Sequence, residues 1–124
     1  PSKVLVTEGA LAGAQPFMDD ALGLGFHSST LMDARFDNVG KIPFVISPKL
    51  ITHGLLDDFV AFEFATVLYD AAEEPKQLYP VEGADHGNVP CPDRDPELGG
   101  EDTPCLATDE WLERVGGFLE EHMP

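Results

Sequence analysis

Positively charged residues are scarce in this chain of 124 residues. Lysine and arginine together number 7, against 23 aspartates and glutamates, and the formal net charge is −16. Because phosphate backbones are bound by clustered cations, this balance argues against nucleic acid as a partner. Two interpretations of the acidity stay open: a hydrated surface that favours solubility, and an adaptation to high salt.

Long apolar runs are missing as well. No stretch approaches the roughly 18 apolar residues of a membrane-spanning helix, so we expect no membrane span. The N-terminus lacks the basic and then apolar pattern of a signal peptide, and it leads almost directly into a predicted strand. Such a start suggests a fragment, a processed form or one half of something larger. Hydrophobic residues still make up 43% of the chain, enough for one small folded domain.

Cysteine occurs only at Cys91 and Cys105, on either side of a loop rich in proline, glycine and acids. A disulfide between them would restrain the loop and place the protein in an oxidising compartment, secreted or periplasmic. Two free thiols would instead suit the cytoplasm. Both alternatives stay open, because the sequence does not give the separation of the two Cα atoms.

Metal-binding motifs are weak. The acidic loop after Asp93 offers oxygen ligands for calcium, but it lacks the glycine that an EF-hand needs at the sixth position. Zinc held by Cys91, Cys105 and His86 would lack the short paired spacing of structural zinc sites. We therefore expect a hydrated loop, no bound metal and no other cofactor.

Hydrophobic patterning predicts an alternation of strands and helices. Strands are expected at 3–7, 49–54 and 76–83, helices at 16–25, 28–36, 63–75 and from Thr108 onward, and connections at 37–48, 55–62 and 88–107. Pro80 favours an edge position or a strand end for the third strand. This order is typical of an α/β fold with three layers, in which a short parallel sheet of about three strands has flanking helices.

Two of the connections that follow predicted strands carry residue types used in catalysis. "HGLLDD" follows the second strand and "EGADHG" follows the third. In a parallel sheet, the loops beyond the carboxyl ends of the strands gather at one edge. A carboxylate of the first loop can therefore accept a hydrogen bond from His86 in the second, which fixes the tautomer that a general base requires.

The stretch "PKLITHGLLDDFVAF…ATVLYDAAEEPKQLYPVEGADHG" resembles the C-terminal part of an α/β-hydrolase of the esterase- and peptidase-like branch. The family pattern is a strand, His-Gly, two residues, the catalytic aspartate, a helix, Pro-Lys, a strand and Gly-Ala-x-His. "KVLVTEG" resembles the strand just after the nucleophile elbow. The resemblance covers about residues 3–87, and the final helix fits the last helix of the family.

This resemblance implies that Asp57 is the triad acid and His86 the general base. Asp58 is the adjacent alternative, but the spacing from His53 favours Asp57. His53 itself is expected to be a packed, structural histidine with a satisfied ring nitrogen. Residues 1–124 would form a single partial α/β-hydrolase domain.

Within that domain, 1–87 would hold the strand and helix units with the acid and the histidine, 88–107 the acidic loop, and 108–124 the C-terminal helix. The chain departs from the family at Ala61, where a proline is usual, and in the length of that loop. The larger departure is the absence of the nucleophile motif G-x-S-x-G. None of the serines is flanked by the glycines of a nucleophile elbow: Ser2, Ser28, Ser29 and Ser47.

Two functions follow as hypotheses. In the first, the chain supplies the acid and the histidine of a serine hydrolase of small-molecule esters or amides, inactive alone, with the nucleophile upstream of Pro1. In the second, it is a stand-alone, non-catalytic remnant that serves as an oligomeric binding or assembly module. Under both, the strand Lys3–Thr7 has an open edge. We expect the N-terminal half of the hydrolase or a second copy to pair there.

Overall fold

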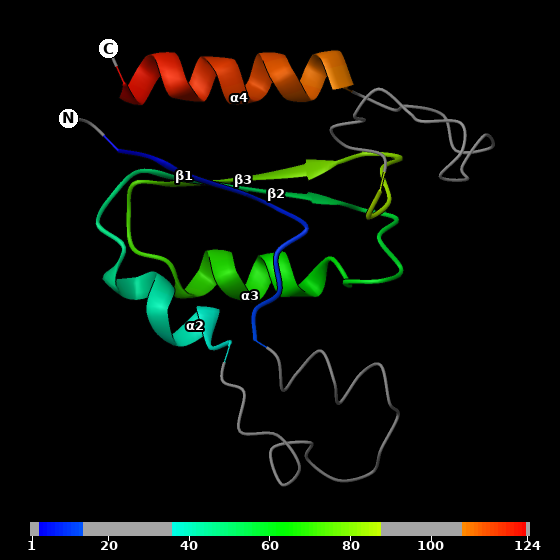
Figure 1. Ribbon diagram of the computed structural model, residues 1–124, viewed down its shortest axis with the longest axis horizontal. Coiled ribbons are helices and arrows are strands. Elements are labelled where there is room, and N and C mark those ends of the chain that lie inside the picture. Colours follow the sequence, from blue (N-terminus) through cyan, green and yellow to red (C-terminus); the bar gives the residue numbers. More distant parts are fainter. Residues whose placement is uncertain (1–2, 14–35, 88–107, 124) are drawn as a thin grey trace, which may run out of the picture.

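A small sheet with helices on both faces makes up the part of the chain that the structure describes (Figure 1). This computed structural model describes residues 3–13, 36–87 and 108–123. The expected helix at 16–25, nearly all of the one at 28–36, and the loop 88–107 with both cysteines lie outside the described residues. The elements in chain order are β1 (Leu5–Glu8), α2 (Asn38–Lys41), η2 (Ile42–Phe44), β2 (Lys49–Gly54), α3 (Glu63–Ala71), β3 (Lys76–Val81) and α4 (Thr108–His122).

The sheet is parallel throughout, with the strand order β1-β2-β3. Its register sets Glu8 at the end of β1 opposite Thr52 in β2, and Gly54 at the end of β2 opposite Val81 in β3. The second strand has the predicted bounds, whereas the first begins two residues later than expected. The carboxyl ends of all three strands therefore lie at the same edge of the sheet.

One face of the sheet is covered by α2, η2 and α3 (Figure 1). A single hydrophobic cluster joins these helices to β2, and its buried members are Ala12, Ile42, Ile51, Val60, Phe64, Ala65, Leu68 and Ala72. The helix α3 thus buries the arc of Phe64, Ala65 and Leu68. Val67, in the same helix, is 47% exposed.

The other face of the sheet carries α4. Trp111 is the link, since its indole Nε1 donates to the hydroxyl of Thr52 at 3.2 Å. The Thr52 hydroxyl in turn donates to the backbone oxygen of Thr7 at 2.9 Å. One side chain in the central strand therefore connects β1, β2 and α4. Phe118 is buried, while Leu112 is 53% exposed.

The segment 37–48, expected to be a plain connection, contains α2 and η2. Asp37 caps α2, because its side chain accepts a hydrogen bond from Gly40 N at 2.8 Å. Contacts far along the chain add to this: Asn38 Nδ2 donates to Leu11 O at 2.8 Å, and Val39 N donates to Ala12 O at 2.9 Å. This short helix therefore depends on tertiary contacts that hydrophobic periodicity does not register.

Candidate active site at the carboxyl edge of the sheet

The loops that follow β2 and β3 pack against each other at one edge of the sheet. Leu55 N donates to Val81 O at 3.1 Å, and Leu56 N donates to Ala84 O at 2.9 Å. Gly54 makes this approach possible, since a β-carbon at that position would lie 2.4 Å from Ala84 O. The missing side chain at Gly54 therefore allows the two loops, one with the aspartate and one with the histidine, to meet.

Asp57 is the buried carboxylate of the first loop, with 0% of its side chain exposed. Its Oδ1 accepts hydrogen bonds from the backbone of Phe59 at 3.0 Å and of Val60 at 2.7 Å. Its Oδ2 lies 2.8 Å from Nδ1 of His86. Both oxygens are thus occupied, one by the turn of its own loop and the other by the imidazole. The neighbouring Asp58 is exposed.

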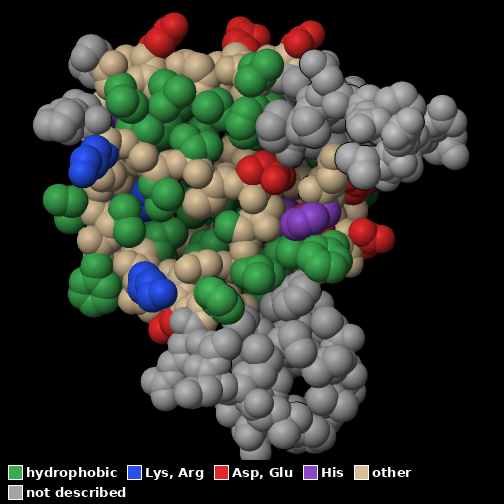
Figure 2. Space-filling model, in the orientation of Figure 1, with side chains coloured by type: hydrophobic (Ala, Val, Ile, Leu, Met, Phe, Trp, Pro, Cys, Tyr) green, Lys and Arg blue, Asp and Glu red, His purple; other side chains and the backbone are tan. Residues whose placement is uncertain are grey.

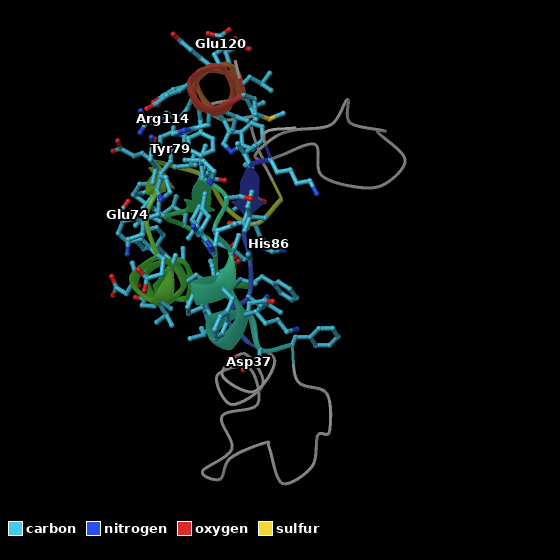
Figure 3. The ribbon with its side chains drawn as sticks, turned by 90° about the vertical axis from the view of Figure 1, so that its left-hand side faces the viewer. Asp37, Glu74, Tyr79, His86, Arg114 and Glu120 are labelled. Carbon is cyan, nitrogen blue, oxygen red and sulfur yellow. The ribbon has the colours of Figure 1, made fainter. Side chains whose placement is uncertain are left out.

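His86 is the exposed partner of this pair, with 42% of its side chain accessible. A carboxylate accepts hydrogen bonds, so Nδ1 carries the proton that faces Asp57, and Nε2 is the basic nitrogen. The ring of Phe59 lies beside the imidazole, with 5.0 Å between the ring centroids. Figure 3 shows His86 on the β1 side of the sheet, away from Tyr79 and Glu74 on the β3 side.

Gly9, like Asp57 and Phe59, lies beside the imidazole of His86. It follows β1 directly and has a φ of +56°, in the left-handed region that favours glycine. A β-carbon at this position would lie 3.3 Å from both Cε1 and Nδ1 of His86. The turn after β1 therefore packs closely against the imidazole and limits its movement.

His53 is a buried side chain that packs against Asp57. It is fully buried, and its Nε2 lies 2.7 Å from Val60 O and 3.2 Å from Oδ2 of Asp57. Both neighbours accept hydrogen bonds, so this nitrogen carries the proton. The packed position agrees with the sequence interpretation. However, Nδ1 of His53 is buried without a partner among the described residues, so only one of its two nitrogens is satisfied.

Glu8 is a site residue that the sequence interpretation missed. It ends β1 at the same edge of the sheet, and its Oε1 is buried without a hydrogen-bond partner among the described residues. The pKa of Glu8 is raised from 4.5 to about 7, mainly because the side chain is partly buried. The charge of His86 acts to lower this pKa, and the charge of Asp57 acts to raise it. The sequence did carry a signal for Glu8. It directly follows the predicted strand 3–7, and Asp57 and His86 also lie in segments that follow predicted strands.

Comparison with known proteins finds relatives named as alpha/beta hydrolase domain-containing proteins, although no family model matches the chain. The human alpha/beta hydrolase domain-containing protein 17B is 37% identical over 88 residues, and the Xenopus laevis protein of the same name matches equally. Each match covers 71% of this chain and 25% of the relative. The chain thus spans a quarter of the length of the curated relatives it matches.

Solved structures share the fold. The esterase domain of a Rhodothermus marinus protein matches with a TM-score of 0.60 at 18% identity, over 98% of this chain and 51% of that one. Thermogutta terrifontis esterase 2, in a form phosphoramylated by tabun, matches with a TM-score of 0.55 at 22% identity, over 99% and 43%. This chain is part of an α/β-hydrolase fold protein. The family resemblance and the predicted α/β class with a three-stranded parallel sheet are therefore confirmed.

The described part of this α/β-hydrolase fold holds no group of three or more histidine, cysteine, aspartate or glutamate side chains arranged to hold a metal. The sites considered for calcium after Asp93 and for zinc at Cys91 and Cys105 lie outside the described residues. Among the helices of the described segments, none has the length and apolar character needed to cross a membrane. The structure brings Asp57 and His86 together, and their catalytic roles stay a prediction.

Proposed function

We propose that this partial α/β-hydrolase supplies the acid and the base of a serine hydrolase that cleaves small-molecule esters or amides. The observation that supports the proposal is the 2.8 Å contact between Nδ1 of His86 and Oδ2 of Asp57. A fully buried acid beside an accessible imidazole is the arrangement that such catalysis needs. The nucleophile serine and the oxyanion-binding loop would lie upstream of Pro1.

In the proposed reaction, Nε2 of His86 takes the proton of the serine hydroxyl while the serine oxygen attacks the carbonyl carbon. Asp57 holds Nδ1–H and stabilises the imidazolium that forms. The imidazolium then returns the proton to the leaving alkoxide or amine. Water, deprotonated by the same Nε2, then attacks the acyl carbon, and the imidazolium returns that proton to the departing serine oxygen as the acid is released.

Ser47 is a poor nucleophile candidate on geometric grounds. It precedes β2 at the amino end of the strand, while Asp57 and His86 lie beyond the carboxyl end. The six residues of β2 separate the two ends by roughly 20 Å at about 3.3 Å per residue. Ser2, Ser28 and Ser29 lie outside the described residues. The proposal therefore assigns the nucleophile to a part of the protein outside this chain.

A fluorophosphonate probe tests this division of labour. We expect the probe to label one serine in the complete protein and none in the isolated chain, because only the complete protein would join the nucleophile to His86. Labelling is read by mass spectrometry of the modified peptide, with His86→Ala as a control that should lose the label. Labelling of the isolated chain at Ser28, Ser29 or Ser47 would contradict the proposal.

The proposed domain organisation is one partial domain over 1–124, which would be completed at β1. Among the described strands β1 pairs only with β2, so its outer edge offers unpaired backbone groups. The surface on this side gathers hydrophobic side chains, with acidic side chains along its top and right and basic ones at its left (Figure 2). Phe36, Phe44 and Ile46 are large hydrophobic residues that the chain leaves exposed, at 64%, 82% and 90%.

We infer that the remaining part of the hydrolase pairs with this edge and that, without it, two copies pair through Lys3–Thr7. Light scattering of the isolated chain should therefore give the mass of a dimer that persists on dilution to micromolar concentrations. Adding the N-terminal half should convert the dimer to a mixed complex. A stable monomer at high concentration would count against this partner surface.

The second candidate function, a non-catalytic binding or assembly module, is favoured by the same open edge and by the absence of a nucleophile motif in the chain. The two candidates differ in the fluorophosphonate experiment. An assembly module predicts a stable dimer of the isolated chain together with a complete protein that no probe labels.

A further inference from the structure

We infer that Glu8 is a positioning residue of the proposed hydrolase: its carboxylate, together with Asp57, stabilises the imidazolium form of His86. This inference deepens the proposed function and rests on it. Asp57 reaches the imidazole through Nδ1, and Glu8 approaches from a different strand. The site would then hold two acidic groups around one base.

The placement of Glu8 supports this role. Its backbone is opposite Thr52, so β1 ends two residues before the end of β2 at Gly54. The next residue, Gly9, donates its N–H to Thr52 O at 3.2 Å and packs directly on the imidazole. The sheet therefore holds the Glu8 backbone within one residue of the contact with His86.

Hydrogen bonds to the described residues do not account for the burial of the Glu8 oxygen Oε1, because no described residue forms one with it. A buried carboxylate oxygen without a hydrogen-bond donor disfavours the ionised form of the group unless a positive charge lies near. The groups that act on its ionisation are His86, from the loop after β3, and Asp57, from the loop after β2. A positive charge formed on His86 during catalysis would meet that need.

If the Glu8 carboxylate stabilises the imidazolium of His86, its contribution to kcat should depend on pH. The pKa of Glu8 is raised to about 7, so the side chain is neutral well below neutrality and ionised above it. Glu8→Gln mimics the neutral form in size and shape. The variant should therefore match the wild type in acid and fall behind it as the pH rises.

The experiment compares the complete wild-type protein with Glu8→Gln on a chromogenic ester. We expect equal kcat at about pH 5.5 and a wild-type kcat about five to ten times larger at about pH 8.5, with the ratio changing around pH 7. KM should stay the same, because Glu8 acts through His86 and not on the ester. Glu8→Asp keeps the charge and should recover part of the wild-type kcat at about pH 8.5. Glu82→Gln, a substitution of an exposed glutamate, should have the same kcat as the wild type at both pH values.

A second readout does not depend on activity. In carbon-13 NMR of the same protein, the carboxyl of Glu8 should titrate near pH 7, at higher pH in His86→Ala and at lower pH in Asp57→Asn. Two results in a folded protein would overturn the inference. One is a ratio of wild-type to Glu8→Gln kcat that does not change with pH, and the other is a pKa of Glu8 that neither His86→Ala nor Asp57→Asn changes. If the complete protein hydrolyses no ester, the proposed function fails, while the NMR titration still decides whether Glu8 and His86 are coupled.

Discussion

Asp57→Asn should lower kcat/KM of the complete hydrolase by about 10⁴-fold while leaving its fold intact. Asparagine keeps an oxygen that can accept the backbone N–H groups of Phe59 and Val60, so the loop stays in place. Its amide nitrogen would then face Nδ1 of His86 and donate to it. The imidazole proton would move to Nε2, which could no longer accept the proton of the serine.

The neighbouring residue provides the matched control. Asp58→Asn makes the same chemical change one position away, on an exposed side chain. We expect kcat/KM to change less than about twofold, since surface substitutions of this kind have little effect. Steady-state kinetics with circular dichroism of each folded variant makes the comparison. Equal losses in both variants, or full activity in Asp57→Asn, would remove Asp57 from the proposed triad.

Gly54→Ala should lower the free energy of unfolding by about 2–4 kcal/mol and weaken the proposed active site at the same time. The added β-carbon would lie 2.4 Å from Ala84 O and 3.0 Å from Asp85 O, both backbone atoms. The loops after β2 and β3 would have to separate, and the hydrogen bond from Leu56 N to Ala84 O would lengthen. His86 would then move away from Asp57.

Chemical denaturation of the complete protein measures this effect, and the final helix offers a control of opposite sign. Nothing lies within 4 Å of a β-carbon at Gly116 in α4. Gly116→Ala should therefore stabilise the protein by up to about 1 kcal/mol, because alanine favours the helix. A Gly54→Ala protein as stable and active as the wild type would mean that this close approach of the loops is not needed.

The contact between Asp57 and His86 was predictable because it depends on topology more than on packing detail. Asp57 and His86 are 29 residues apart, but both follow strands of one parallel sheet, and such loops share an edge. The strand Lys49–Gly54 was also predictable, since it is a short, β-branched segment that ends at glycine. Both inferences use rules that hold whatever the side chains around them do.

Other features were not predictable, for identifiable physical reasons. The helix α2 depends on a cap by Asp37 and on contacts with Leu11 and Ala12, which lie far away in the sequence. Glu8 follows a predicted strand, but the burial of its Oε1 and the packing of the next residue, Gly9, against His86 appear only in the structure.

The hydroxyl of Thr52 has a consequence for how this chain could evolve or be engineered. It accepts from Trp111 and donates to Thr7, so a single oxygen ties the first strand, the central strand and the last helix. The proposed acid, Asp57, is held by the backbone N–H groups of Phe59 and Val60 and by the rings of His53 and His86. All of these groups also belong to this polypeptide. Under the proposed function, recombination could therefore join this segment as one unit to different N-terminal halves that carry a nucleophile, with the contact between Asp57 and His86 already formed.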